Sequence, residues 1–217
     1  MRAEALVFDA YGTLYDVHSV VRRCETCFPG KGAALSQLWR AKQLEYTWQR
    51  SLMQCYVPFS QVTRDALAYS CAALGLPLGE HESTLMEEYL HLAPFPEVRA
   101  ALARLPGKKA ILSNGSPDLL EPLVRNSRLH FDAVLSVDEL GIYKPAPQVY
   151  ELAVQRLRVA RERIAFVSSN CWDALGAKSY GFTVYWINRS GAPVDVLGFR
   201  PDAQFESLAG VVDEVLR

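Results

Sequence analysis

The stretch LVFDAYGTLYD, residues 6–16, decides the fold class of this 217-residue chain. An apolar run at residues 6–8 ends directly at Asp9, and the next carboxylate along the chain is Asp16. A short run of consecutive apolar residues is typical of a strand buried on both faces, as in a parallel sheet. Asp9 therefore lies where such a strand would end, and no acidic residue stands next to it.

Four more segments have the character of buried strands: residues 110–112, 133–135, 164–167 and 183–187. Helical patterns separate several of them, at residues 118–125, 148–157 and 172–180. This alternation predicts an α/β fold, a Rossmann-like parallel sheet with helices on both faces. Ligands of such sheets bind beyond the carboxyl ends of the strands. We therefore expect an active site at the edge where three strand ends deliver Asp9, Ser113, Asn114 and residues 168–170.

Residues 15–92 have a different pattern, with apolar residues at helical spacing and no strand-like run. The spacing predicts helices at residues 35–46, 62–74 and 85–90, with Gly75 and the prolines at 94 and 96 as stop signals. We therefore expect an inserted all-helical cap domain at residues 15–92. The catalytic core would then consist of residues 1–14 and 93–217.

Composition and charge argue against several classes of function. Lys and Arg total 23 and Asp and Glu total 24, a balance that gives no support to a nucleic-acid or membrane-surface partner. Without a cationic leader or a run of about 18 apolar residues, we expect no membrane span and a cytoplasmic location. The five cysteines are odd in number and scattered, which argues against a disulfide framework. Cys24 and Cys27 have C-x-x-C spacing, but zinc would need a second ligand pair.

Four motifs, in this order along the chain, resemble those of the haloacid dehalogenase superfamily: DAYGTLYDV at 9–17, LSNGSPDLL at 112–120, YKPAPQVY at 143–150 and FVSSNCWDALGAKSYGF at 166–182. Together with LWRAKQLEYTW at residues 38–48, they are similar to its L-2-haloacid branch, the type II (S)-2-haloacid dehalogenases. Phosphatases of the superfamily carry aspartates where Tyr11 and Ser169 stand here. Because Mg²⁺ prefers carboxylate ligands, the two replacements argue against a metal site.

The resemblance implies a hydrolase of carbon–halide bonds that needs no metal and no cofactor. In the family, the aspartate that matches Asp9 displaces halide from an L-2-haloalkanoic acid such as chloroacetate or L-2-chloropropionate. Water then hydrolyses the aspartyl ester and releases the 2-hydroxy acid with C2 inverted. The implied partner is this small molecule, and because dimers are common in the family the expectation includes a homodimer.

The resemblance also implies a role for each matching residue. The catalytic set is Asp9, Thr13, Lys144, Ser168, Asn170 and Asp173, in which Lys144 pairs with Asp9 and Asp173 positions or activates water. The substrate- and halide-binding set is Tyr11, Arg40, Ser113, Asn114, Tyr150 and Trp172. Arg40 would receive the departing halide on a guanidinium that is always charged and weakly hydrated. Plain structural roles stay open for Tyr150 and Trp172 as core aromatics, and for Asp173 as a helix-start acid.

Two other functions stay open at this point. A superfamily phosphatase acting on a small phosphomonoester would depend on a cation to offset the charge of its substrate, so a chelator would stop it. A non-catalytic descendant that binds a metabolite or a protein would release neither halide nor phosphate. The full set of motif residues favours the dehalogenase over both.

Overall fold

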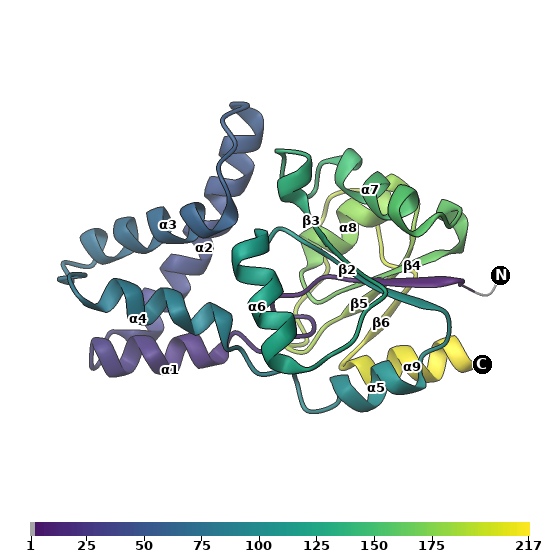
Figure 1. The fold of residues 1–217 in the computed structure, drawn as a ribbon, viewed down its shortest axis with the longest axis horizontal. Helices are drawn as coiled ribbons and strands as arrows, with labels where there is room; N and C mark the ends of the chain where they lie inside the picture. The colour runs from purple at the N-terminus through teal and green to yellow at the C-terminus, as the bar shows by residue number, and fades with distance from the viewer. Residues whose placement is uncertain (1–2) are drawn as a thin grey trace.

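The computed structural model describes residues 3–217, and a parallel sheet forms its centre (Figure 1). Six strands lie in the order β3-β2-β1-β4-β5-β6, and each pairs with its neighbours in parallel. They are β1 (Ala5–Phe8), β2 (Lys108–Ser113), β3 (Ala133–Ser136), β4 (Ile164–Ser168), β5 (Thr183–Ile187) and β6 (Ala203–Phe205). The predicted α/β core with a parallel sheet is confirmed, because the five expected apolar segments form its first five strands.

The central strand is β1, whose four residues are all buried. Its Val7 is in register with Ala110 of β2 on one side and Phe166 of β4 on the other. The chain continues from β1 outward through β2 and β3, and then returns to the other side of β1 with β4, β5 and β6. At such a reversal of strand order a crevice forms beyond the carboxyl ends of the strands. Asp9 is the first residue beyond β1.

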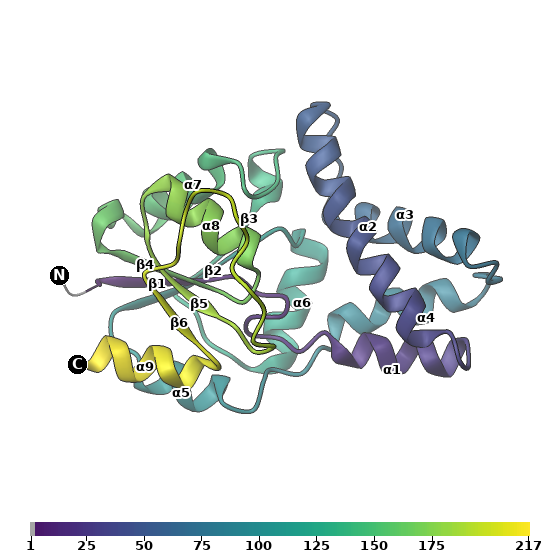
Figure 2. The same cartoon turned by 180° about the vertical axis from the view of Figure 1, so that it is seen from behind.

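Helices cover both faces of the sheet (Figures 1 and 2). On one side, α5 (Val98–Arg104) packs against α9 (Leu208–Leu216), and on the other α7 (Pro147–Leu157) packs against α8 (Cys171–Tyr180). Helix α6 (Pro117–Ser127) contacts both β3 and the short 3₁₀ helix η1 (Glu88–Leu90). Two further 3₁₀ turns are η2 (Val137–Glu139) and η3 (Arg161–Arg163). The buried helix faces are apolar, for example Leu208, Val211 and Val212 of α9, and each such side chain contributes about 1.5–3 kcal/mol.

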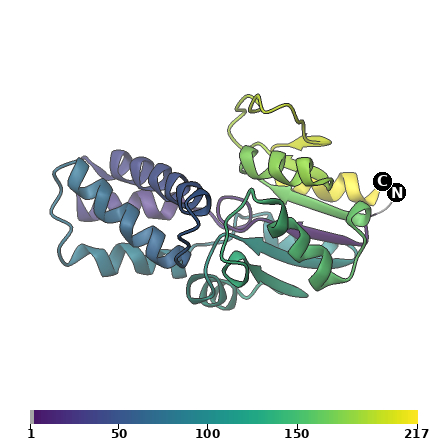
Figure 3. The same cartoon turned by 90° about the horizontal axis from the view of Figure 1, so that it is seen from above.

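Four helices form a bundle beside the sheet (Figure 3). They are α1 (His18–Cys27), α2 (Gly32–Leu52), α3 (Phe59–Ala73) and α4 (His81–Glu87). Helix α2 buries Leu35, Trp39, Gln43 and Thr47, spaced four residues apart on one face, as helical periodicity requires. The indole N–H of Trp39 donates to the backbone carbonyl of Thr63 at 2.8 Å, which joins α2 to α3. The carboxyl end of α2 extends beyond the other three helices (Figure 2).

Two segments of chain connect this bundle to the sheet, and they run side by side. The N–H of Phe95 donates to the carbonyl of Leu14 at 3.0 Å, and the N–H of Asp16 donates to the carbonyl of Ala93 at 2.8 Å. Because the outgoing segment starts a few residues after Asp9, the bundle is attached at the same edge of the sheet as Asp9.

Several elements were not predicted from the sequence: α1, α5, α9 and β6. Helix α1 buries only Val20 and Cys24, so few apolar residues mark it in the sequence. The prediction that residues 133–135 form a strand buried on both faces is wrong, because β3 is an edge strand and its Val134 is 38% exposed. Within residues 3–217, none of the helices combines the length and the apolar character needed to cross a bilayer.

Candidate active site

The turn after β1 brings the chain back to the Asp9 carboxylate. Gly12 has a φ of +83°, a left-handed conformation that glycine adopts at little cost, and a Cβ there would lie 3.3 Å from Ser169 Oγ. The turn places the Thr13 hydroxyl 3.1 Å from Asp9 Oδ2, to which it donates. Thr13 Oγ1 also accepts the backbone N–H of Ser169 at 2.8 Å. The ends of β1 and β4 are therefore joined through one hydroxyl group.

Three donors fix the orientation of the Asp9 side chain, which is nearly buried. The Lys144 ammonium donates to Oδ1 at 3.2 Å. Oδ2 accepts from Thr13 and from the amide of Asn170, the latter at 2.8 Å. Hydrogen bonds to an ionised carboxylate are stronger than neutral ones. They hold the carboxylate in one orientation at the mouth of the crevice.

The ammonium group of Lys144 lies between two carboxylates. Lys144 comes from the loop that precedes α7, is 1% exposed, and places Nζ 2.9 Å from Asp173 Oδ2 as well as 3.2 Å from Asp9 Oδ1. Burial lowers the pKa of Lys144, but the two carboxylates more than offset this and hold the pKa above its usual value. Lys144 thus supplies a positive charge shared by the two carboxylates. Within residues 3–217, no three His, Cys, Asp or Glu side chains converge in a metal-binding arrangement.

Asp173, in the first turn of α8, is completely buried behind Lys144. Its Oδ2 accepts from the hydroxyl of Ser168 at 3.2 Å, and its Oδ1 accepts from the hydroxyl of Tyr150 at 2.9 Å. Burial raises the pKa of Asp173 to about 6, although Lys144 lowers it; the charge of Asp9 adds to the increase. A carboxyl group that titrates close to neutral pH is suited to exchanging a proton during a reaction.

The close packing of Tyr150 against α8 requires a glycine. A Cβ on Gly176 would lie 2.5 Å from the Tyr150 hydroxyl oxygen and 2.6 Å from Pro145 Cβ. We expect Gly176→Ala to displace Tyr150 from Asp173 and to lower the free energy of unfolding by about 1–3 kcal/mol. Urea unfolding measures this change. Ser179→Ala, an exposed change on the same helix, is the control and should alter the midpoint little; equal midpoints for the two variants would contradict the assigned contact.

Arg40 reaches the sheet edge from the helical bundle. Together with Asn170 and Trp172 it lines a cavity of about 450 Å³ beside the Asp9 turn. Trp172 meets Trp48 of α2 edge to face, with ring centroids 5.6 Å apart. The cavity therefore has one wall from the bundle and one from the carboxyl ends of β4 and β5.

Ser113 and Asn114 stand at the end of β2. The side-chain oxygen of Asn114 accepts the backbone N–H of Lys144 at 3.0 Å, which leaves the amide N–H groups for an anion. The Ser113 hydroxyl oxygen accepts the N–H of Gly115 at 3.0 Å, so its own hydrogen can be donated elsewhere.

Tyr11 contributes both backbone and ring to the site. Its carbonyl accepts from Asn170 at 3.2 Å, and its ring lies 6.0 Å from the rings of both Phe59 and Tyr89, centroid to centroid. Burial raises the pKa of Tyr11 far above its usual value, so the hydroxyl stays protonated. This hydroxyl is buried, and within residues 3–217 it has no hydrogen-bond partner.

The residues predicted from the sequence thus fall into two groups. One hydrogen-bonded network contains Asp9, Thr13, Asn114, Lys144, Tyr150, Ser168, Asn170 and Asp173. The side chains of Tyr11, Arg40, Ser113 and Trp172 are not joined to Asp9 by a hydrogen bond among the described residues. The sequence analysis placed Ser169 at this edge without giving it a role, and it missed Phe59, Tyr89 and Arg189, which lines the cavity. Arg189 follows β5 directly after Asn188, so the strand-end signal that singled out Asp9 would have found it.

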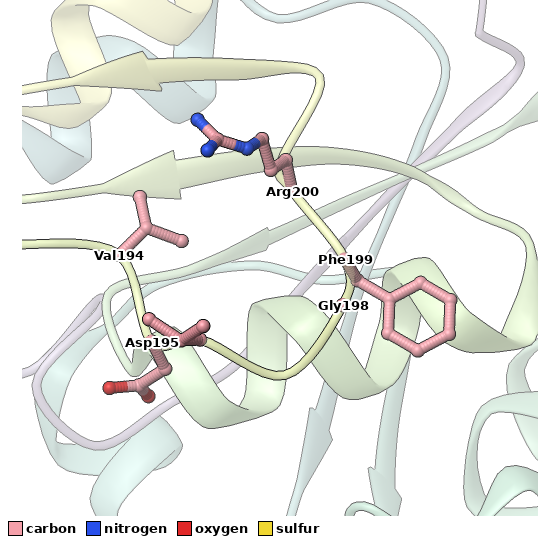
Figure 4. A pocket seen from close by; sticks show the side chains of 6 residues that line it. Val194, Asp195, Gly198, Phe199 and Arg200 are labelled. Carbon is pink, nitrogen blue, oxygen red and sulfur yellow. The ribbon is translucent and has the colours of Figure 1, made fainter.

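A second hollow of about 450 Å³ lies in the loop between β5 and β6. Its lining includes Val194 and Asp195 on one limb of the loop and Phe199 and Arg200 on the other (Figure 4). None of the predicted site residues lines it. The cavity described above, in contrast, has Arg40, Asn170 and Trp172 of the predicted set in its lining.

Comparisons with known proteins identify haloacid dehalogenases as relatives of this chain. The haloacid dehalogenase-like hydrolase family matches residues 3–181. An (S)-2-haloacid dehalogenase of Pseudomonas sp. strain YL is 52% identical over 216 residues, which cover 97% of this chain and 93% of the relative. The crystal structure of an L-2-haloacid dehalogenase superposes with a TM-score of 0.98 at 48% identity and covers 100% of both chains. The Xanthobacter autotrophicus L-2-haloacid dehalogenase with chloropropionic acid covalently bound has a TM-score of 0.92 at 40% identity, covering 99% of this chain and 98% of its own.

Proposed function

The chain belongs to the haloacid dehalogenase-like hydrolases, and we propose that it hydrolyses L-2-haloalkanoic acids to 2-hydroxy acids with inversion at C2. Substrates of this class include chloroacetate and L-2-chloropropionate. The observation that carries the proposal is the Asp9 carboxylate, oriented by Lys144, Thr13 and Asn170. Asn170 also lines the cavity that Arg40 reaches from the helical bundle.

In the first step, a carboxylate oxygen of Asp9 attacks C2 of the substrate from the side opposite the halogen. A carbon–oxygen bond forms, and the carbon–halogen bond breaks as the halide leaves with its electron pair. The attacking group needs a fixed direction and its full negative charge. The contacts of Lys144, Thr13 and Asn170 supply the direction without a divalent cation on the carboxylate, which would weaken it as a nucleophile.

In the second step, water attacks the carbonyl carbon of the Asp9 ester. Asp173 accepts a proton from this water, and the oxyanion that forms is stabilised by Lys144 and Asn170. The bond between the Asp9 carbonyl carbon and the ester oxygen then breaks, and the departing alkoxide takes the proton back. The product is the 2-hydroxy acid. The second hydrogen of the attacking water remains on the Asp9 carboxyl group and leaves to solvent as a proton, so that Asp9 is a carboxylate again.

The remaining predicted residues would bind the two anionic ends of the substrate. Arg40 and Asn114 would stabilise the departing halide, and Ser113 with the backbone N–H beside Tyr11 would hold the substrate carboxylate. Tyr11 and Trp172 would form apolar walls of the pocket, and Tyr150 would support Asp173. Ser168 would support the same carboxylate.

Three properties of the whole molecule belong to the same proposal. The helical bundle of residues 15–92 would act as a cap that supplies Arg40 to the core. The enzyme would be cytoplasmic, which agrees with five free cysteines. It would also form a homodimer, for which the exposed Leu52 and Met53 at the projecting end of α2 offer an apolar contact, and light scattering would measure its mass in solution.

The decisive assay is chloride release from the L- and D-isomers of 2-chloropropionate, measured separately with a metal chelator in the buffer. We expect release from the L-isomer alone, at the same rate with and without chelator, since Lys144 supplies the positive charge beside the Asp9 carboxylate. The product should be the D-hydroxy acid, as inversion requires. No release from either isomer, together with Mg²⁺-dependent phosphate release from phosphomonoesters, would contradict the proposal and favour the phosphatase alternative.

A further inference from the structure

Arg189, two residues beyond β5, contacts both segments that join the cap to the core. In the outgoing segment, its Nη2 donates to the backbone carbonyl of Thr13 at 3.1 Å. In the returning segment, its guanidinium carbon lies 3.6 Å from the centre of the Phe95 ring. Its Nη1 lies 2.8 Å from Glu97 Oε1, a contact that is an ion pair without hydrogen-bond geometry. One side chain thus ties three parts of the chain together.

The chemistry of arginine suits this arrangement. The guanidinium is planar and rigid, so one side chain can stack on an aromatic face while its edge meets a carbonyl and a carboxylate. A lysine would keep the charge but would lose the stack and the fixed spacing of the donors. The Arg189 side chain is only 23% exposed, and it forms part of the cavity wall together with Arg40 and Asn170.

The contact with Thr13 leads directly to the nucleophile. The carbonyl of Thr13 accepts from Arg189, and the hydroxyl of the same residue donates to Asp9 Oδ2 at 3.1 Å. The turn that carries Thr13 contains Gly12 at a φ of +83°, a residue without a side chain to restrict its backbone. Fixing the carbonyl of Thr13 therefore fixes where its hydroxyl lies. A small displacement of the Thr13 hydroxyl would reorient the Asp9 carboxylate, and the rate of its attack on the substrate depends strongly on that orientation.

We propose that Arg189 is a positioning residue for the reaction, holding the Thr13 turn against the Asp9 carboxylate and the returning cap segment beside it. The catalytic part of this inference rests on the proposed dehalogenase function. The structural part, that Arg189 restrains the Thr13 turn, does not depend on the substrate.

The test compares Arg189→Met with Arg99→Met. Arg99 is a matched control because its guanidinium, like that of Arg189, donates to the backbone. Its acceptors are the carbonyls of Ser127 at 2.7 Å and Arg128 at 3.2 Å, at the end of α6 and away from Asp9. For L-2-chloropropionate, we expect Arg189→Met to lower kcat about 10- to 100-fold while KM changes less than about threefold. Arg99→Met should keep kcat within about twofold of the wild type.

Two further measurements separate positioning from general stability. If Arg189 acts through the Thr13 hydroxyl, Arg189→Met should lower kcat less than about threefold in a Thr13→Val background. In that background the hydroxyl is already gone, and the effects of two substitutions in one contact do not add. Amide hydrogen exchange at residues 13–16, measured without substrate, should be faster in Arg189→Met and unchanged in Arg99→Met. Arg189→Lys is less disruptive and should show the same changes to a smaller extent. It replaces Arg189→Met in these measurements if Arg189→Met does not fold.

The outcomes are distinguishable. Equal kcat values for the Arg189 and Arg99 variants, or an Arg189 effect that is undiminished in Thr13→Val, overturn the positioning role. Unchanged exchange at residues 13–16 overturns the restraint itself. A wild-type enzyme that releases no halide overturns the proposed function instead, while the exchange measurement still decides whether Arg189 restrains the turn.

Discussion

Asp9→Asn is expected to abolish halide release, with kcat for L-2-chloropropionate falling by at least about four orders of magnitude. An amide has no negative charge, so it is a far weaker nucleophile toward carbon than a carboxylate. The side-chain volume hardly changes, and the amide oxygen can still accept from one of the present donors. Circular dichroism and the urea midpoint should therefore show a folded protein, and halide release measures the loss.

Asp65→Asn is the matched control for this change. Asp65 pairs with Arg50 at 2.9 Å and accepts from Gln61 at 2.7 Å within the helical bundle. The same loss of charge there should leave kcat nearly unchanged. An Asp9→Asn enzyme that keeps activity within about tenfold of the wild type would be incompatible with a covalent role for Asp9.

A single turnover in ¹⁸O-labelled water tests the covalent step independently. If water attacks the carbonyl carbon of the Asp9 ester, the label enters the Asp9 carboxylate, and the first molecule of hydroxy acid carries unlabelled oxygen from Asp9. If Asp9 instead activated a water that attacked C2 directly, the label would appear in the first product. The second result would exclude the ester while leaving the substrate class intact.

The sheet was predictable because most of its strands are short runs of consecutive apolar residues. Such runs are rare in segments exposed to solvent. Residues 5–8 and 164–167 are buried on both faces in the structure, as their sequence indicates. The missed elements have the opposite character. Strand β6 has three residues, of which Gln204 is exposed, and α1 buries two of its ten residues. Tertiary contacts rather than local pattern determine such elements, so a single sequence carries little signal for them.

The site was predictable to the extent that its residues follow strands or lie in recognisable motifs. Asp9, Asn114 and Asn170 converge because parallel strands end at one edge. No local pattern connects Phe59 of α3 and Tyr89 of η1 with the ring of Tyr11, since that contact depends on how these helices meet the end of the sheet. Arg189 is an intermediate case. Its position after β5 is visible in the sequence. Its three contact partners are about 90 to 180 positions away along the chain, and only the tertiary fold brings them close.

The second large effect is expected from the replacement of Asp173, the buried carboxyl group that would accept a proton from water. We expect Asp173→Asn to lower turnover about 10²- to 10⁴-fold, chiefly through hydrolysis of the ester, because an amide cannot accept the proton of the attacking water. Asp9 keeps its charge and its contact with Lys144, so halide displacement should continue until each enzyme molecule carries one ester. A burst of one halide per active site, with the 1-carboxyethyl group of the Asp9 ester detected on the intact protein by mass spectrometry, measures this accumulation.

The same carboxyl group should determine how the wild type depends on pH. Burial raises the pKa of Asp173 to about 6, and only the ionised form, which predominates above that pH, can accept a proton. Ester hydrolysis in the wild type should therefore decrease as pH falls through about 6, approaching a tenfold loss per pH unit below it. The slow hydrolysis that remains in Asp173→Asn should lack this dependence. If the variant kept the same acid limb, the titrating group would be another residue and Asp173 would have a structural role, holding Lys144 and Tyr150 in place. If Asp173→Asn instead shows the halide burst and its slow ester hydrolysis does not decrease at low pH, both the proton transfer and the pH dependence belong to this one buried carboxylate.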